Sequence, residues 1–181
     1  MQEKFEKLFY EFEPEQAMGG DWCVSPQPYF HGARNIAGAK LNLGFQTIVA
    51  PVLMDREPHA HREDEYLAFL GSQLPDMFPA FDAEIHLCMG PDLAHMEKIV
   101  ITEPTMVRVP RGWQHGPLNF VRVDKPVFFQ AINQAQDTAY LKEVVWARGA
   151  EATIVLGDDT RLFELRVGAP WPQRPWTVVN E

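Results

Sequence analysis

Short apolar runs separated by turn residues fill the chain from residue 39 onward and restrict the folds open to it. The runs are rich in Val, Ile, Phe and Thr, are bounded by Gly, Pro, Asp and Asn, and read AKLNLGFQTIVAPVLM, EYLAFLGS, AEIHLCMG, KIVITEPTMVRVP, PLNFVRV and PVFFQAIN. This composition is typical of β-strands. Many short strands with frequent turns favour an all-β sandwich or barrel. We therefore predict a β-barrel core over residues 39–133.

The residues before this core, 1–38, carry a different pattern. Their large apolar side chains recur at spacings of three and four, at Phe5, Leu8, Phe9 and Phe12. That spacing puts them on one face of a helix. Pro14 and the pair Gly19-Gly20 break the pattern. We expect a short N-terminal helix and an extended arm, packed on the barrel or on a second subunit.

The residues after the core, 134–181, are assigned to the same domain, because 181 residues suit a single domain and no boundary is visible. YLKEVVWA fits a strand or a helix, whereas TIVLG and RLFELRV predict a hairpin around GDDT. The final APWPQRPWTVVNE holds three prolines and two tryptophans. We expect it to be an extended arm on the surface or on a partner chain.

The net charge of the chain limits the classes of partner that it can bind. The formal net charge is −9 and the pI is about 5.1. Nucleic acids and anionic membrane surfaces require clustered Lys and Arg, so we expect neither as a partner. The N-terminus lacks a signal-peptide pattern, and no apolar run approaches the roughly 20 residues of a membrane span. Cys23 and Cys88 have no metal-type spacing and are interpreted as reduced thiols of a cytoplasmic protein.

Two imidazoles and a carboxylate crowd together in EPHAHREDEYLAFLG, residues 57–71. Because side chains alternate along a strand, His59 and His61 project from one face, about 7 Å apart. Glu65 returns to that face on the next strand, after a turn. Such a cluster is costly to bury unless a cation binds it. We therefore interpret it as part of a metal site.

A second stretch, VPRGWQHGPLNF at residues 109–120, supplies a further imidazole. Pro110 and Gly112 predict a tight turn, and His115 opens the strand that follows. Three imidazoles and one carboxylate suit one divalent transition metal, Fe(II), Mn(II), Ni(II), Zn(II) or Cu(II), and affinity order does not choose among these ions.

These two stretches resemble the motifs of the cupin superfamily. His59-x-His61-x-x-x-Glu65 followed by Gly71 resembles the first motif, and Pro110-x-Gly112-x-x-His115-x-x-x-Asn119 matches the core of the second. The resemblance implies a double-stranded β-helix, or jelly-roll barrel, of six to eight strands with one metal at its centre. By match to the motifs, the ligands are His59, His61, Glu65 and His115.

The positions of other side chains near the motifs predict that they line the substrate pocket. The candidates are Gln46, Phe69, Arg108, Trp113 and Gln130. The glutamines are equally compatible with buried amides that satisfy backbone groups. Arg108 could grip a substrate carboxylate or pair on the surface with Glu103 or Asp124. His86 is expected outside the metal cavity, because Ile85, Leu87 and Met89 form the apolar face of its strand.

The ligand set indicates a catalytic metal with open coordination positions. We expect a small-molecule enzyme, favouring Fe(II) and a non-haem dioxygenase-type reaction on a carboxylated or aromatic metabolite. The alternatives are a non-redox Lewis-acid isomerase, lyase, decarboxylase or cyclase using Zn, Mn or Ni, and a non-catalytic small-ligand-binding protein. Glu65 could remain a ligand or act as a general base. A homodimer is expected, because such barrels leave sheet edges that a second subunit can cover.

Overall fold

The computed structural model describes residues 5–16 and 20–134, apart from the side chain of Glu6, and the backbone of four later strands. The strands are β1 (Pro14–Glu15), β2 (Gln27–His31), β3 (Asn42–Ile48), β4 (Val52–Asp55), β5 (His59–Ala60), β6 (Glu65–Gly71), β7 (Ala83–Gly90), β8 (Glu97–Ile101), β9 (Thr105–Val109), β10 (Gln114–Val123), β11 (Val127–Asn133), β12 (Tyr140–Val145), β13 (Ala152–Gly157), β14 (Arg161–Leu165) and β15 (Thr177–Val179). Short 3₁₀ turns, η1 (Glu6–Leu8), η2 (Gly32–Arg34) and η3 (Leu93–His95), are the helical elements among these residues. None of the described helices has the length and apolarity that a bilayer crossing requires.

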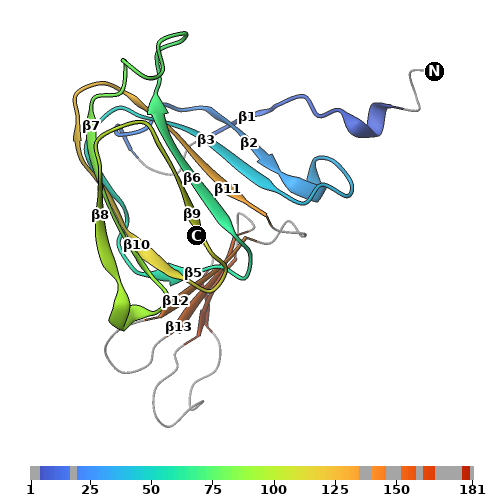
Figure 1. Ribbon diagram of the computed structural model, residues 1–181. Coiled ribbons are helices and arrows are strands. Elements are labelled where there is room, and N and C mark those ends of the chain that lie inside the picture. The colour runs from blue at the N-terminus through green and yellow to red at the C-terminus, as the bar shows by residue number, and fades with distance from the viewer. Residues whose placement is uncertain are drawn as a thin grey trace.

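The strands form two antiparallel sheets that face each other (Figure 1). One sheet has the order β1-β2-β3-β11-β6-β9, and the other has the order β15-β14-β13-β12-β5-β10-β7-β8, with β4 also paired to β10. β11 lies between β3 and β6, and β10 lies between β5 and β7, so β10 and β11, which are consecutive in the chain, belong to opposite sheets. This double-sheet barrel confirms the predicted all-β fold.

Alternation along the strands separates an apolar inner face from an outer face. On β6, Leu67 and Phe69 are buried, and their partners on β11 are Ala131 and Phe129. Side chains of directly paired residues share a face of the sheet, so these four point into the barrel. The inner faces of both sheets together form one hydrophobic core.

Three phenylalanines from three strands form the centre of that core. Phe69 of β6, Phe120 of β10 and Phe129 of β11 are at most 3% exposed. Their ring centroids lie 5.1 to 6.1 Å apart, in stacked, tilted and edge-on arrangements. Each such aromatic pair contributes about 0.5–1.5 kcal/mol beyond the burial of its area. One end of the barrel interior is therefore filled by aromatic side chains.

The predicted N-terminal helix is wrong. Within residues 5–16, the helical structure is the single turn η1, and β1 follows it, paired with β2. Isolated helices shorter than about 12 residues are marginal in water, and Figure 1 shows this segment extending away from the sheets that would have to support a helix. Phe12 instead packs edge-on against Phe45 on the outer face of β3, with ring centroids 5.7 Å apart.

The structure tests some of the predictions for residues 134–181. YLKEVVWA supplies β12, and TIVLG and RLFELRV supply β13 and β14, which pair antiparallel as predicted for a hairpin. Within the predicted arm at residues 169–181, β15 pairs with β14, and the rest of that arm lies outside the described residues. β12 also pairs with β5, aligning Val144 with His59 and Glu143 with Ala60.

Candidate metal centre

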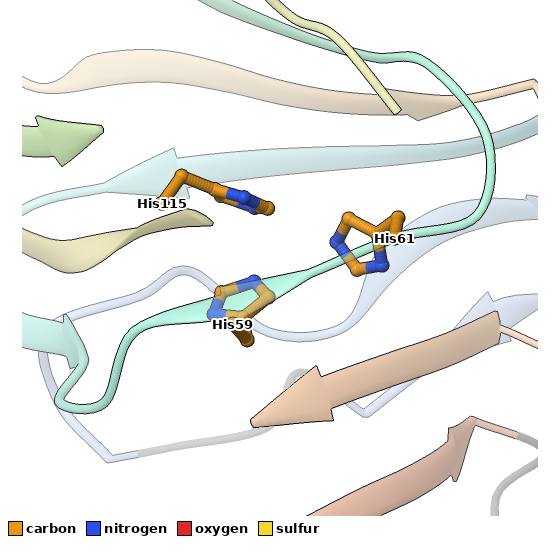
Figure 2. Close-up of side chains that lie close together, drawn as sticks. All are labelled: His59, His61 and His115. Carbon is orange, nitrogen blue, oxygen red and sulfur yellow. The ribbon is translucent and has the colours of Figure 1, made fainter. Parts of the chain in front are cut away.

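Two strands of one sheet bring the three motif histidines together. His59 of β5 is the direct cross-strand partner of His115 of β10, and His61 lies two residues beyond His59. Their ring centroids are 4.0 Å apart for His59 and His115, and 5.0 and 5.1 Å for the pairs that include His61. Figure 2 shows the three rings turned toward one common volume.

A glycine in the second motif allows this close approach. Gly116 follows His115 and has a φ of +97°, which favours glycine. A Cβ atom at this position would lie 2.7 Å from the carbonyl oxygen of Glu57 and 3.5 Å from Nδ1 of His59. Any larger residue would push β10 away from the segment that carries His59.

Glu65 approaches the histidines from the opposite sheet. It is the first residue of β6, and its Oε2 lies 2.8 Å from Nε2 of His115 and 3.4 Å from Nε2 of His61. Its Oε1 accepts a hydrogen bond from Nδ2 of Asn133 at 3.4 Å. The cluster therefore bridges the two sheets at one end of the barrel. Sequence alternation had placed Glu65 on the next strand, and that strand belongs to the other sheet.

The four side chains are deeply buried, with exposed fractions of 2% for His59, 4% for His61, 3% for His115 and 2% for Glu65. Burial alone raises the pKa of the Glu65 carboxyl. When the His115 and His61 rings are protonated, the hydrogen bonds that they donate and their positive charge outweigh burial and hold the pKa of Glu65 well below its ordinary value. The group is therefore a carboxylate near neutral pH.

The outer nitrogens of two rings set their orientation. Nδ1 of His59 lies 3.2 Å from the carbonyl oxygen of Glu57, and Nδ1 of His115 lies 3.5 Å from that of Trp113. A carbonyl can only accept, so each Nδ1 is the donor and each neutral ring has its lone pair on Nε2. In His115 that lone pair faces the Glu65 carboxylate. Two acceptors at 2.8 Å repel each other unless a proton or a cation lies between them.

The arrangement fits a divalent transition metal. One ligand nitrogen from each of the three histidines lies within 4.8 Å of the others. Ligands of a single ion at about 2.0–2.2 Å are roughly 3–4 Å apart, so a modest contraction completes the site. Three imidazoles and one carboxylate are a donor set that binds such ions well.

Asp64 ties the two ligand-bearing segments together. Its Oδ2 accepts from Nε and Nη2 of Arg108 at 2.8 and 2.6 Å, and its Oδ1 accepts from the backbone N–H of Arg111 at 2.9 Å. The backbone N–H of Gly112 donates to the carbonyl of His61 at 2.8 Å. The turn of the second motif is thereby held against the loop between His61 and Glu65. These hydrogen bonds and the positive charges of the arginines lower the pKa of Asp64.

Arg108, which was predicted to bind substrate, uses its guanidinium to bind Asp64. Its side chain is 58% exposed, and its guanidinium is paired with Asp64 rather than with Glu103 or Asp124. The partner lies 44 residues earlier in the chain, and sequence spacing gave no sign of it.

The other four residues predicted to line the pocket lie in different parts of the barrel. Gln46 lies on the inner face, where its Nε2 donates to the hydroxyl of Tyr29 at 3.2 Å. Gln130 pairs with Phe45 and Ala68, and this register puts it on the outer face, opposite to Glu65. Phe69 belongs to the aromatic core. Trp113 packs against the core from the turn before His115.

His86 lies outside the histidine cluster, as predicted, with its Nε2 2.7 Å from Oε1 of Glu84.

Sequence reasoning missed several polar side chains that share the inner face with Glu65. They are Asn133, Asn42, His31 and Tyr29. Asn133 could have been found from alternation along PVFFQAIN, because it has the same parity as the buried Phe129. Asn42 is placed by the pairing of β3 with β11, and His31 and Tyr29 are placed by the pairing of β2 with β3. Neither pairing leaves a periodic signal in the sequence.

Comparison with protein-family models and with curated proteins finds no match. Among solved structures, the chain is similar to hydroxypropylphosphonic acid epoxidase from S. wedmorenis, with 15% identity, a TM-score of 0.41, and coverage of 62% of this chain and 51% of that one. It is similar to an oxalate decarboxylase of Bacillus subtilis, with 16% identity, a TM-score of 0.47, and coverage of 72% and 29%. It is also similar to a recombinant oxalate oxidase, with 11% identity, a TM-score of 0.48, and coverage of 74% and 62%.

The chain thus spans less than two thirds of the length of each of these proteins. The fold assignment rests on the chain's own features: two facing antiparallel sheets and two motifs whose histidines meet between them. By its strand order and its clustered motif histidines, this chain has the cupin fold.

Proposed function

We propose that the protein is a metal-dependent enzyme that binds one divalent transition metal through His59, His61, His115 and Glu65. The observation that carries the proposal is the burial of these four side chains with their donor atoms facing one another. A buried cluster of this kind destabilises a fold unless a cation compensates it. We further propose Fe(II) as the preferred metal and a dioxygenase-type reaction on a small carboxylated or aromatic metabolite.

The charge balance of the site supports an anionic substrate. Three neutral imidazoles and one carboxylate leave a divalent ion with one uncompensated positive charge. Such a centre attracts a carboxylate, and the low-dielectric surroundings strengthen the attraction. A bound metal supplies Lewis acidity, and iron adds redox chemistry with dioxygen.

The protein groups have distinct parts in this proposal. The histidines fix the position of the metal, and Asn133 orients the Glu65 carboxylate by donating to Oε1. Glu65 serves as a ligand in this proposal, and a role as general base would require its carboxylate to leave the metal. The aromatic core beside the site excludes water from one side.

The test is the metal content of protein purified without a chelating tag, measured by elemental mass spectrometry on aerobic and anaerobic samples. Oxygen uptake is then followed with catechols, thiols and oxo-acids. About one iron per chain with oxygen uptake would support the proposal. About one zinc, manganese or nickel without oxygen uptake would replace it with Lewis-acid chemistry. Failure to bind any of these ions after reconstitution would leave a non-catalytic ligand-binding protein.

The homodimer is proposed on a separate observation. The N-terminal segment exposes large apolar side chains, with exposed fractions of 47% for Phe5, 62% for Leu8, 75% for Phe9 and 52% for Phe12. Contiguous exposed apolar surface commonly marks an association site. Light scattering should give twice the chain mass for the wild type, and Phe9→Ser combined with Leu8→Ser should give the monomer mass. A monomeric wild type would overturn this assembly without affecting the metal site.

A further inference from the structure

The register of the six-stranded sheet places four polar residues in one row. His31 of β2 pairs with Asn42 of β3, Asn42 pairs with Asn133 of β11, and Asn133 pairs with Glu65 of β6. Directly paired residues point to the same side of a sheet, so this row lies on the inner face with the proposed ligand Glu65. Three strand spacings of about 4.8 Å, roughly 14 Å in all, separate the ends of the row.

The solvent exposure of the inner-face side chains increases from β6 to β3. On β6, the inward residues Glu65, Leu67 and Phe69 are at most 4% exposed. On β3, every residue from Asn42 to Thr47 is only partly buried, on the inner and outer faces alike. The inner face is therefore closed at Glu65 and reachable by solvent at β2 and β3.

The next row has two small residues in its middle. It runs from Tyr29 through Gly44 and Ala131 to Leu67. Gly44 has no side chain and Ala131 has a single methyl group. The Tyr29 ring lies over Gly44, because a Cβ atom there would be 3.3 Å from the ring. Small residues thus separate Tyr29 from the buried Leu67.

Two hydrogen-bond donors lie at this end of the face, the Tyr29 hydroxyl and the buried Nδ2 of Asn42. The hydroxyl of Tyr29 accepts from Gln46, which leaves its own hydrogen available. Burial raises the pKa of the Tyr29 phenol, so the group stays protonated. Nδ2 of Asn42 is buried and makes no hydrogen bond with the described part of the chain. An unmet buried donor is costly, and a ligand oxygen would relieve that cost.

His31 is held in place at the same end. Its Nε2 lies 2.8 and 3.0 Å from the two carboxylate oxygens of Glu15, and its ring stacks on Tyr29 with centroids 6.0 Å apart. The inward positions of β2, β3 and β11 hold no Lys or Arg. Recognition at this end therefore depends on hydrogen bonds rather than on a positive charge.

We propose that Tyr29, His31 and Asn42 form a recognition wall that binds the end of the substrate remote from the metal, and that this end carries a hydroxyl or carbonyl oxygen. The inference rests on the proposed metal centre, which holds the other end. Glu15 and Gln46 are positioning residues, because they act through His31 and Tyr29. The substrate class is accordingly a small acid whose carboxylate meets the metal and whose far end is a neutral oxygen.

The experiment compares two probe acids on Co(II)-loaded protein. Hexanoate and ω-hydroxyhexanoate differ only in the terminal hydroxyl, and shorter pairs of the same kind vary the reach. Calorimetry should show the hydroxy acid binding about tenfold more tightly than its partner at the best chain length. The double variant Tyr29→Phe with Asn42→Ala should bind both acids equally, with the Co(II) visible spectrum unchanged.

The two glutamines provide a matched control. Gln46→Ala, on the inner face, should reduce the preference about threefold, whereas Gln130→Ala, on the outer face, should leave it unchanged. A wild type without preference at any chain length, or a preference that survives in the double variant, would overturn the wall alone. Absence of Co(II) binding in the wild type would overturn the metal centre and the wall with it, so the two failures are distinguishable.

Discussion

The two ends of the barrel interior are built from the same strands and differ in chemistry. β6, β10 and β11 each contribute one polar residue to the metal end and one phenylalanine to the aromatic end, as Glu65 and Phe69, His115 and Phe120, and Asn133 and Phe129. All six are at most 3% exposed. On each strand, two residues that are four or five positions apart are equally buried, but burial stabilises the fold at the phenylalanine and costs free energy at the polar residue.

The difference shows how the barrel separates stability from chemistry. Burying an aromatic side chain removes apolar area from water and stabilises the fold. Burying imidazoles and a carboxylate costs free energy that only hydrogen bonds or a cation return. The aromatic end should thus carry the stability of the metal-free protein, and the metal end should contribute stability only when an ion is bound.

The largest effect is expected at the aromatic end. Phe120→Ala removes a side chain with no exposed surface and should reduce the free energy of unfolding by about 3–5 kcal/mol. Denaturant titration measures this loss, and the folded fraction should still bind one metal per chain. Val121→Ala, at the 41% exposed neighbouring position on β10, is the control and should have little effect. Loss of metal from folded Phe120→Ala would show that the two ends are not separable.

The metal end should add stability only with its ion. At a free metal concentration one hundred times the dissociation constant, the wild type should gain about 2.7 kcal/mol of unfolding free energy. His59→Ala should abolish this gain and leave the metal-free protein as stable as the wild type, or more so. Thermal melts with and without Co(II) provide the measurement. A large loss of stability in metal-free His59→Ala would contradict the comparison.

Asn133 should affect metal affinity although it is not itself a proposed ligand. Its Nδ2 donates to the carboxylate of Glu65, so Asn133→Ala should weaken Co(II) binding by about tenfold. Gln130 lies three residues earlier on the same strand and faces outward. Gln130→Ala is therefore the matched control, with an expected change below about twofold in a spectroscopic Co(II) titration.

The smallest effect is expected from Arg108. Its exposed pairing with Asp64 only steadies the loop between His61 and Glu65, so Arg108→Ala should weaken Co(II) binding about threefold. Arg122→Ala removes a comparable surface pairing with Asp82 and should not change Co(II) affinity. If both variants weakened the metal equally, a general electrostatic effect would replace the loop explanation.

Local patterns in the sequence predicted much of this molecule. Runs of β-formers located the strands, and motif spacing identified the three histidines that the fold clusters. The N-terminal spacing failed because three- and four-residue intervals fit a helix only where something packs against it. Gln46 and Gln130 could not be told apart, since the face that each occupies depends on the register of β11 against β3. His31 and Asn42 were missed for the same reason.

The two-residue strand β5 has a consequence for how the site can change over evolution. One edge of β5 is held by β10 and the other by β12, a strand more than eighty residues later that aligns Val144 with His59. So short a segment cannot fix its own register. Substitutions in the C-terminal part of the chain can therefore shift the His59 backbone and retune the preferred ion while both motifs stay unaltered. Related chains with identical motifs but divergent tails are the natural place to look for a change of metal.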